Sequence, residues 1–532
     1  MKPETITALF LTFVLAALAL LSPPGATFLE QALGESPEAR AADHVRAVVR
    51  GDERTAEGVW GLPSPLPDEP TERLRERRQT DTWRAVSREA DSQSAPPEPE
   101  AEDAWYIRHG FGQHPPPPAE PWPRPLPSTS PAAVAPAGDF FVYLPLVAKG
   151  AAPEFRALWI TRFDWTRADG TWAQPSALVT IAEQAAAAGF NVLLFQVRGV
   201  GDAFYTPGYE PWSPRLTGTV TRTLGVSPGF DPLTVLIEAA HARGLQVHAY
   251  LNVYPTWPCG VGAPPDGTSP LHPFWAFSRT NGRGWSAWRV YDSGGNPMNL
   301  MTCSSYLWAT PAWEGMRAHF LNVVTDLVTR YDIDGIHLDL VRYPGPNYSY
   351  DPFTPEFSDP AARADWQREQ VNLLVRETYR VVKAHKPNVW VTAAVWGVYQ
   401  NRWGWPSFSQ GFSDYYQDSK RWLREGWVDA IMPMIYPAGP SSTCPDSTVW
   451  TLERFQVLVA DFLADAGGRY VFPGIHGGYA CFDDILNRVR ASRELGAQGQ
   501  AIFSHGAINS RGYWDELALW AYPAPAPVPP LP

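Results

Sequence analysis

Short apolar runs alternate with longer amphipathic runs from residue 154 onward in this 532-residue chain. Nearly continuous apolar strands, each followed by an amphipathic helix that ends near Gly or Pro, are typical of parallel strands buried on both faces. The strands are predicted at 155–160, 190–198, 245–254, 334–340, 389–396, 428–436, 469–478 and 499–505. The helices between them are predicted at 175–189, 231–244, 320–332, 366–385, 418–426, 453–467 and 483–496.

Eight such units predict an α/β fold closed as a (β/α)8 TIM barrel. An open doubly wound sheet would need a reversal of strand order and usually a Gly-rich phosphate loop, and no GxGxxG follows the first strand. We therefore predict one barrel domain over residues 151–522, followed by a Pro-rich tail at residues 523–532.

The residues before the barrel have a different composition. Residues 1–26 combine Lys2 with an apolar run from Ala8 to Leu21, which is shorter than the roughly 20 residues of a bilayer span and fits a secretory signal. An uncleaved membrane anchor is the alternative, and both readings predict a secreted or cell-envelope protein. Residues 27–150 are rich in Pro, Glu, Arg and Ala, so we predict a disordered linker there.

The net charge and the cysteines limit the classes of partner and of metal site that the chain is expected to have. A net charge of -12 without a basic stripe excludes a nucleic-acid partner, and 24 Trp residues indicate a binding surface. The four cysteines of an exported chain predict two disulfides. Proximity in sequence favours Cys259 with Cys303 and Cys444 with Cys481, and the absence of CxxC spacing argues against zinc.

Carboxylates fall at both ends of the predicted strands. In barrels of this kind the active site lies at the carboxyl ends of the strands, while the amino ends serve stability. Asp334 and Asp429 begin strands, whereas Asp339 ends the strand DGIHLDL and is predicted to face the mouth. The sequence therefore predicts Asp339 as the functional acid and Asp334 as a structural residue.

The other predicted strand ends carry acids, amides and aromatic side chains. Aromatic faces stack on pyranose rings and fixed polar groups bind sugar hydroxyls, so this mixture predicts a carbohydrate site. The residues concerned are Asp164, Trp165, Gln196, Arg198, Asp202, His248, Asn252, Tyr254, His337, Arg342, Tyr343, Trp396 and Tyr436.

Glycoside hydrolysis normally uses two carboxyl groups that flank the bond. Asp339 is the first of these carboxyl groups. Asp164, Asp202 and Asp418 are the candidates for the second, and Glu210 is a weaker candidate. Asp164 best fits a proton donor, because the adjacent Trp165 offers apolar surface that raises a carboxyl pKa.

His337 raises the question of a metal site with Asp339 and His248, since His and Asp are good ligands for zinc or manganese. Alternate positions on a strand point the same way, so His337 shares a face with Asp339 and is better interpreted as a hydrogen-bond donor beside that acid. We predict no metal and no cofactor.

Eight ordered blocks between residues 154 and 515 resemble the glycosyl hydrolase-like 10 family. The blocks are RALWITRFDW, LFQVRGVGDAFY, EPWSPRLTG, ARGLQVHAYLN, YDIDGIHLDLVRYP, ADWQREQVNLLV, QDSKRWLREGWVDAIMPMIYP and FPGI. The resemblance implies a (β/α)8 barrel and an envelope or secreted glycoside hydrolase, with one branch of the family acting on peptidoglycan glycan strands. It adds Arg156, Trp159 and Trp212 to the expected substrate-binding residues. The other matching positions are Asp164, Trp165, Gln196, Pro211, Gly218, His248, Asn252, Asp334, Gly335, Asp339, Trp366, Arg368, Asp418, Trp422, Asp429, Pro433 and Tyr436.

The chain also departs from related patterns. Leu340 stands where some relatives carry a second acid, and His505 lies in the run FSHG where some carry an acid at the end of the last strand. Val341 occupies the position of the acid in the DGxDxDxE motif of chitinase-type barrels, so substrate-assisted cleavage is not supported. These departures motivate an alternative, a glycan-binding barrel without catalysis that is tethered to the envelope through its N-terminal segment. The enzyme is favoured because Asp339 and the polar mouth are intact, and we expect a monomer that acts on a polysaccharide.

Overall fold

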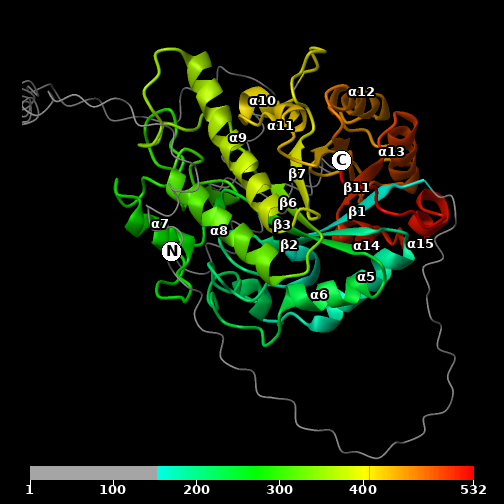
Figure 1. Cartoon of the computed structure of the whole chain (residues 1–532), viewed down its shortest axis with the longest axis horizontal. Helices are drawn as coiled ribbons and strands as arrows, with labels where there is room; N and C mark the ends of the chain where they lie inside the picture. Colours follow the sequence, from blue (N-terminus) through cyan, green and yellow to red (C-terminus); the bar gives the residue numbers. More distant parts are fainter. Residues whose placement is uncertain (1–151, 407) are drawn as a thin grey trace, which may run out of the picture. The chain divides into compact units, whose positions relative to one another are not determined.

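The computed structural model describes residues 152–406 and 408–532, so the predicted signal segment and linker lie outside the described residues. Parallel strands form one sheet at the centre of the domain (Figure 1). The seventh strand of the barrel is made of two short pieces, β9 and β10. The strands are β1 (Phe155–Ile160), β2 (Val192–Arg198), β3 (Gln246–Asn252), β6 (Gly335–Asp339), β7 (Trp390–Trp396), β8 (Ala430–Met434), β9 (Tyr470–Val471), β10 (Gly474–His476) and β11 (Gly499–Phe503).

The sheet closes on itself, which confirms the predicted barrel. Strand β1 pairs in parallel with β2 on one side and with β11 on the other. Strand β10 pairs with β11 and also with β8, where Gly474 lies opposite Met434. The predicted strands at 155–160 and 499–505 thus become neighbours, and the strand at 334–340 lies between those at 245–254 and 389–396 in the same closed parallel sheet.

Helices surround the strands in Figure 1, and neighbouring helices pack on one another in the pairs α5 with α6, α8 with α9 and α12 with α13. Several helices begin with Pro in the first turn after a residue whose side chain accepts a backbone N–H, as Asp231 does from Thr234 and Asp359 does from Ala361. The longer helices are α5 (Pro175–Ala187), α6 (Pro232–His241), α7 (Pro273–Thr280), α8 (Glu314–Arg330), α9 (Pro360–His385), α12 (Leu452–Leu463) and α13 (Phe482–Glu494).

Shorter elements occupy the connections. An insertion after β3 forms the antiparallel hairpin of β4 (Pro255–Pro258) and β5 (Tyr306–Trp308). The remaining short elements are α4 (Arg162–Trp165), η3 (Pro214–Thr217), α10 (Gly411–Asp414), α11 (Ser419–Arg424), α14 (His505–Arg511), α15 (Trp514–Glu516) and η4 (Leu517–Ala521). Within the described ranges no helix is long and apolar enough to cross a membrane.

Each strand buries side chains on both faces, which explains its nearly continuous apolar sequence. On β2, Leu194 belongs to the cluster inside the barrel, while Leu193 and Phe195 belong to the larger cluster beneath the helices. The inner cluster also contains Phe155, Trp159, Tyr250, Trp390 and Phe472. The barrel is therefore filled with large rings.

Asn and Asp side chains connect neighbouring strands at the amino end of the barrel. Asn191 accepts the N–H of Arg156, Asp334 accepts that of Val247, and Asp429 accepts that of Val391, each at 2.8 Å. Asp334 also contacts Nε2 of His241 at 2.9 Å. These contacts confirm that Asp334 lies at the end of the barrel opposite to Asp339.

The Pro-rich tail is a packed part of the domain. The backbone carbonyl of Pro527 accepts the N–H of Glu154 at 2.9 Å, and that of Pro530 accepts the hydroxyl of Tyr470 at 3.0 Å. The side chains of Val528 and Leu531 pack against the inner cluster. The tail therefore covers the amino end of the barrel, which the sequence pattern did not predict.

We expect Leu531→Ala to lower the free energy of unfolding by about 1–2 kcal/mol, because it removes a partly buried apolar side chain from this end of the barrel. Leu519→Ala is the matched control, since that side chain is 64% exposed and its truncation should change stability little. Denaturant unfolding of the two variants measures the difference. Equal stabilities would show that the tail does not support the barrel.

Candidate functional site

Asp339 lies at the carboxyl end of β6 and faces the interior of the barrel mouth. Its Oδ2 accepts a 2.7 Å hydrogen bond from the hydroxyl of Tyr250 on the neighbouring strand β3. Its Oδ1 accepts the N–H of Leu340 at 2.6 Å, and Leu340 has a φ of 50°, so the chain turns directly after the acid. The carboxylate is thus fixed on both oxygens.

Burial sets the electrostatics of this acid. Removal from water raises the pKa of Asp339, while the bonds from Tyr250 and Leu340 and the charge of Arg342 act in the opposite direction. Burial and the charge of Asp339 raise the pKa of both Tyr250 and Tyr436 well above the usual tyrosine value. Tyr250 therefore stays protonated and remains a hydrogen-bond donor.

Tyr250 is a site residue that the sequence reasoning missed. His248, Tyr250 and Asn252 alternate along β3, so the period of two that placed the first and the third on one face places Tyr250 there as well. Arg162 and Tyr306 were also missed, because they lie in the short elements α4 and β5 outside the barrel strands, and the Arg162 guanidinium donates to the Tyr306 hydroxyl across 144 positions of sequence. No local pattern predicts such a contact.

Several predicted residues do lie around the mouth. Gln196 at the end of β2 accepts both the N–H and the guanidinium of Arg162, at 3.0 and 3.1 Å. Trp396 at the end of β7 packs on Tyr415, with ring centroids 4.2 Å apart, and donates its indole N–H to the carbonyl of Ser409.

The mouth continues through further strand ends. Asn252 donates to the carbonyl of Gly199, and its own Oδ1 is buried without a hydrogen-bond partner in the part of the chain that the structure describes. Tyr436 stacks on Phe503, with ring centroids 5.7 Å apart. The mouth therefore combines fixed amides, a carboxylate and aromatic faces.

Arg342 follows Asp339 by three residues and is held by aromatic rings. Its guanidinium carbon lies 5.4 Å from the ring centroid of Trp308, 5.1 Å from that of Trp396 and 4.5 Å from that of Tyr415. Arg342 Nη1 donates to the carbonyl of Tyr343 at 3.1 Å, and Nε has no protein acceptor among the described residues. This guanidinium is the cation that acts on Asp339.

His337 and Trp159 form the layer of the barrel interior below Asp339. The indole N–H of Trp159 donates to Nε2 of His337 at 3.0 Å, so Nδ1 carries the proton and donates to Oγ1 of Thr392 at 2.8 Å. Burial lowers the pKa of His337 well below its usual value. Both residues are fully engaged in the core, which corrects their prediction as substrate-binding groups and the interpretation of His337 as a donor to the acid.

Arg156 and His248 lie still deeper, near the amino ends of β1 and β3. Arg156 forms a 2.7 Å ion pair with Glu154, and its guanidinium donates to the carbonyl of Ala524 in the tail. The ring of His248 is fully buried between Phe155 and Trp390, and burial lowers its pKa to about 3. Arg156 and His248 thus lie toward the amino end of the barrel, away from the mouth where they were expected to bind substrate.

Other predicted binding residues are packed outside the sheet. Trp165, Tyr254 and Tyr343 are buried in the cluster beneath the helices, where Trp165 packs on Phe195. Trp212 is half-buried against the same cluster. Residues just past a strand end thus turn outward here, which corrects the prediction that they line the mouth.

Arg198 is a structural cation. It is buried, forms an ion pair with the fully buried Glu210 at 2.8 Å and donates to the carbonyls of Asn252 and Val253. The charge of Arg198 and the contact with His319 lower the pKa of Glu210 to about 2 despite its burial. Arg198 and Glu210 therefore fix the loops after β2 and β3 and are not available to a ligand.

The three candidates for a second acid differ in their surroundings. Asp202 accepts the N–H of Val200 at 2.8 Å, and Asp418 accepts the hydroxyl of Tyr399 at 2.7 Å at the start of α11. Asp164 lies just after β1 and accepts the N–H of Thr161 and the hydroxyl of Ser504, which follows β11. Burial raises the pKa of Asp164 to about 6, so this carboxyl holds its proton in mildly acidic solution.

Asp164, in α4 just after β1, and Asp339, at the end of β6, lie at the same end of the barrel. Within the described ranges, no second carboxylate shares a hydrogen-bond partner with Asp339. The described residues also contain no group of three or more His, Cys, Asp and Glu side chains arranged to hold a metal ion. The chemistry that this arrangement supports is proton transfer and charge stabilisation by carboxylates.

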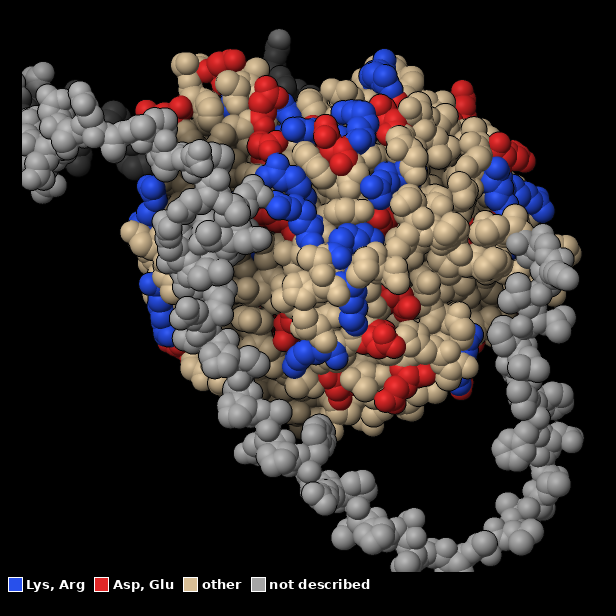
Figure 2. Space-filling model, viewed as in Figure 1, with Lys and Arg blue, Asp and Glu red and all other residues tan. Residues whose placement is uncertain are grey.

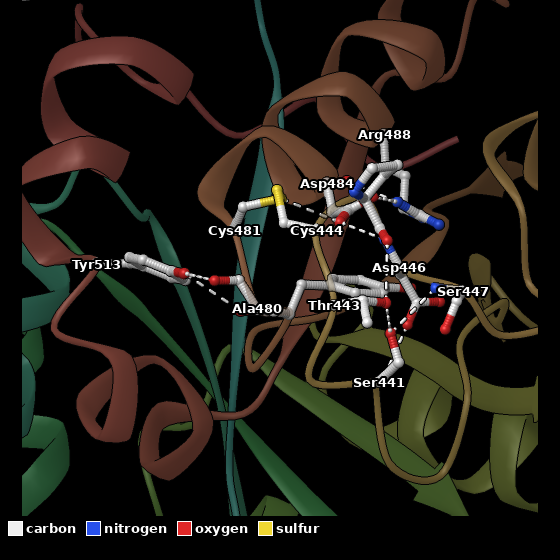
Figure 3. The surroundings of a disulfide bond; sticks show 12 residues. Ser441, Thr443, Cys444, Asp446, Ser447, Ala480, Cys481, Asp484, Arg488 and Tyr513 are labelled. Atoms are coloured by element: carbon white, nitrogen blue, oxygen red, sulfur yellow. Dashed lines mark hydrogen bonds and ion pairs between the residues drawn. A yellow bond between two sulfur atoms is a disulfide. The ribbon is translucent and has the colours of Figure 1, made fainter. Parts of the chain in front are cut away.

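Both predicted disulfides are present. Cys259 is bonded to Cys303 and Cys444 to Cys481, each with Cα atoms 5.6 Å apart. The first bridge joins the ends of the β4–β5 insertion. Figure 3 shows the second, which ties the loop after β8 to the start of α13, beside the hydrogen bond from Asp446 N–H to Asp484. The bridges fix loops that follow the carboxyl ends of β3 and β8.

The surface gives no sign of a polyanion-binding face in the view of Figure 2. Lys and Arg side chains are interspersed there with Asp and Glu, and uncharged residues fill broad areas between them. This mixed distribution on the drawn face agrees with the acidic composition.

Comparison with known proteins gives a family and relatives. The family described as Glycosyl hydrolase-like 10 matches residues 154–451, more than half of the chain. The chain is 26% identical over 440 residues to glycosyl hydrolase YngK from Bacillus subtilis, covering 74% of this chain and 77% of that protein. It is 28% identical over 321 residues to glycosyl hydrolase DigH from Escherichia coli K12, covering 55% of this chain and 67% of that protein.

Among solved structures, the chain is similar to the glycoside hydrolase domain of PgaB (BpsB) from Bordetella bronchiseptica. The superposition has a TM-score of 0.49 at 14% sequence identity, and it covers 69% of this chain and 98% of that domain.

The raised pKa of Asp164 predicts how the stability of the folded protein depends on pH. The folded-state pKa of about 6 exceeds the ordinary aspartate pKa of 3.8, so the folded protein binds this proton more tightly than the unfolded chain does. Asp164 therefore contributes stability that is lost as pH rises from about 4 to about 6.

Asp164→Asn has no titrating group at this position, so its free energy of unfolding should not show this loss. We expect the free energy of unfolding of the variant, relative to that of the native protein, to rise by up to about 3 kcal/mol between pH 4 and pH 7. Denaturant unfolding at a series of pH values measures this change, with Asp169→Asn as the exposed control. A pH-independent difference would contradict the raised pKa.

Proposed function

Because this chain belongs to the glycosyl hydrolase-like 10 family, we propose that it hydrolyses O-glycosidic bonds in a polysaccharide of the cell envelope or the extracellular space. The observation that carries the proposal is Asp339, held by Tyr250 at the carboxyl end of β6 in a mouth of amides and aromatic rings. Such a mouth suits stacking on sugar rings and hydrogen bonding to their hydroxyls.

Asp339 acts on the sugar as nucleophile or base. The Tyr250 hydroxyl orients one carboxylate oxygen and, because it remains protonated, stabilises the charge of that oxygen. Arg342 lies close enough to add its positive charge. The free lone pairs of the carboxylate then face the mouth, where the anomeric carbon or an attacking water would lie.

Asp164 is the proton donor in this proposal. Its pKa of about 6 lets part of the population hold a proton near neutral pH, which a leaving glycosidic oxygen requires. Asp202 and Asp418 are the alternatives for this role, and the raised pKa of Asp164 is the reason for preferring Asp164.

The family resemblance points to peptidoglycan glycan strands as the first substrate to test. Two disulfides among the described residues fit an oxidising compartment, and so an exported protein. We further propose a monomer that acts on the polysaccharide without a cofactor.

One observation favours a second candidate, a glycan-binding barrel without catalysis. Leu340 and His505 stand where some relatives of the family carry further acids, whereas hydrolases normally place two carboxyl groups across the bond. The two candidates differ in turnover and agree in binding.

We expect Asp339→Asn to fold normally, to bind oligosaccharide and to lose at least about two orders of magnitude in turnover, the scale of a lost positioned acid or base. Asp334→Asn is the matched control on the same strand, and it should lower stability more than turnover because it breaks the contacts with Val247 and His241. Release of reducing ends from purified glycan strands measures turnover. Binding without turnover in the native protein would favour the non-catalytic barrel.

The role of Asp164 predicts a pH profile. Turnover should fall as pH rises through about 6, because the protonated donor disappears. Asp164→Asn should remove this limb along with most of the activity on substrates whose leaving group needs a proton. A substrate with an acidic phenol leaving group should be spared, and equal losses on both substrates would assign the donor elsewhere.

A further inference from the structure

A pocket beside the barrel mouth is lined by cationic and aromatic side chains. It lies between the loop after β1, the loop after β2 and the β4–β5 hairpin, and six of its residues matter here: Arg162, Phe163, Asp202, Arg215, Ser305 and Tyr306. The sequence predicted only Asp202 among these six, as a candidate catalytic acid.

The two guanidiniums flank one exposed ring. The guanidinium carbon of Arg162 lies 4.2 Å from the ring centroid of Phe163, and that of Arg215 lies 4.7 Å from the same centroid. Phe163 is 55% exposed, whereas Arg162 is only 4% exposed. Two like charges are therefore held close together at the wall of a pocket, which costs free energy unless an anion joins them.

The protein supplies neutral partners to both arginines. Arg162 donates to Gln196 and to the hydroxyl of Tyr306, and Arg215 donates to the hydroxyl and the carbonyl of Thr166. Within the described ranges neither guanidinium forms an ion pair, and Nη1 of Arg215 has no protein acceptor and is open to solvent. Charge-assisted donors are thus left free at this wall.

Asp202 is the one carboxylate of the lining and offsets part of this charge. Its Oδ1 accepts the N–H groups of Gly199 and Val200. Two arginines and one aspartate leave a net charge of +1 on the lining. A singly charged anion matches this balance better than a dianion does.

The pocket adjoins the acid of the proposed site. Arg162 binds Gln196, which lies at the end of β2 in the mouth, and its charge acts on Tyr250, which in turn donates to Asp339. On the other side, the Cys259–Cys303 bridge and the bond from Cys259 N–H to the carbonyl of Ser305 fix the hairpin that presents Tyr306. Both walls are therefore rigidly placed relative to the mouth.

We propose that this pocket is a subsite for a carboxylate carried by a sugar of the bound glycan, with Arg215 and Arg162 as its cationic ligands and Phe163 and Tyr306 as its aromatic walls. The proposal rests on the proposed function in that it takes the ligand to be a glycan, and it adds the class of that glycan, one with carboxylated sugars. The planar guanidinium edge suits the two oxygens of a carboxylate.

Three monosaccharide probes test the subsite on the native full-length chain: glucuronate, its neutral methyl ester and glucose 6-sulfate. We expect glucuronate to bind about tenfold more tightly than the ester, the equivalent of one charge-assisted hydrogen bond. Ligand-observed NMR titration measures the affinities. The ester comparison needs no variant, so equal binding of acid and ester overturns the proposal directly, and tighter binding of the sulfate overturns the assignment to a carboxylate.

Arg215→Gln should abolish the preference for glucuronate over the ester. Arg222→Gln is the matched control, because it removes the same charge from an exposed position seven residues further along and should keep the preference. A preference unchanged in Arg215→Gln would refute the role of this arginine. If the native protein prefers glucuronate but cleaves no glycan, the carboxylate subsite is supported and the hydrolase proposal is rejected. Failure of the subsite and failure of the proposed function are therefore distinguishable.

Discussion

The hydrogen bond from the Trp159 indole to His337 fixes the layer of side chains that positions the residues of the barrel mouth. It joins β1 to β6 across the interior, and the bond from His337 to Thr392 extends it to β7. Both ring nitrogens are hydrogen-bonded in a fully buried site, so the imidazole is held in one tautomer and stays neutral. A polar residue is tolerated here only because every one of its groups is satisfied.

This layer positions the residues above it. The ring of Tyr250 packs edge-on against His337, and Asp339 follows His337 by two positions on the same face of β6. Tyr250 therefore reaches the carboxylate from a fixed ring position, and the site inherits its geometry from the packed rings below. The polar and aromatic groups of the mouth are held at strand ends, while the groups that line the adjacent pocket lie in the connections around them.

The sequence predicted the barrel and the place of Asp339 well, because both depend on local rules. Apolar runs of strand length and the direction of each strand distinguish Asp339 from Asp334 without any tertiary information. The cysteine pairs followed from proximity, and the structure has both. Alternation would also have found Tyr250.

The errors have a common physical origin. Tyr254, Tyr343 and Trp165 follow strand ends, where the chain leaves the regular alternation and loop packing decides which way a side chain turns. Family motifs selected Arg156 and His248 together with Asp339, since a motif does not separate residues that maintain the fold from residues that meet a ligand. The pairing of Arg162 with Arg215 depends on loops that only the folded chain brings together.

The closure of the barrel by its two ends has a consequence for the order of folding. Phe155 pairs with Gly499, and the N–H of Glu154 is bound by Pro527 beneath the same strand. A nascent chain that has not reached these residues has an open edge on β1 and an uncovered cluster of rings, so its central layer cannot be completed. Synthesis thus delays the final collapse of this domain until its last strand and the segment below it have emerged.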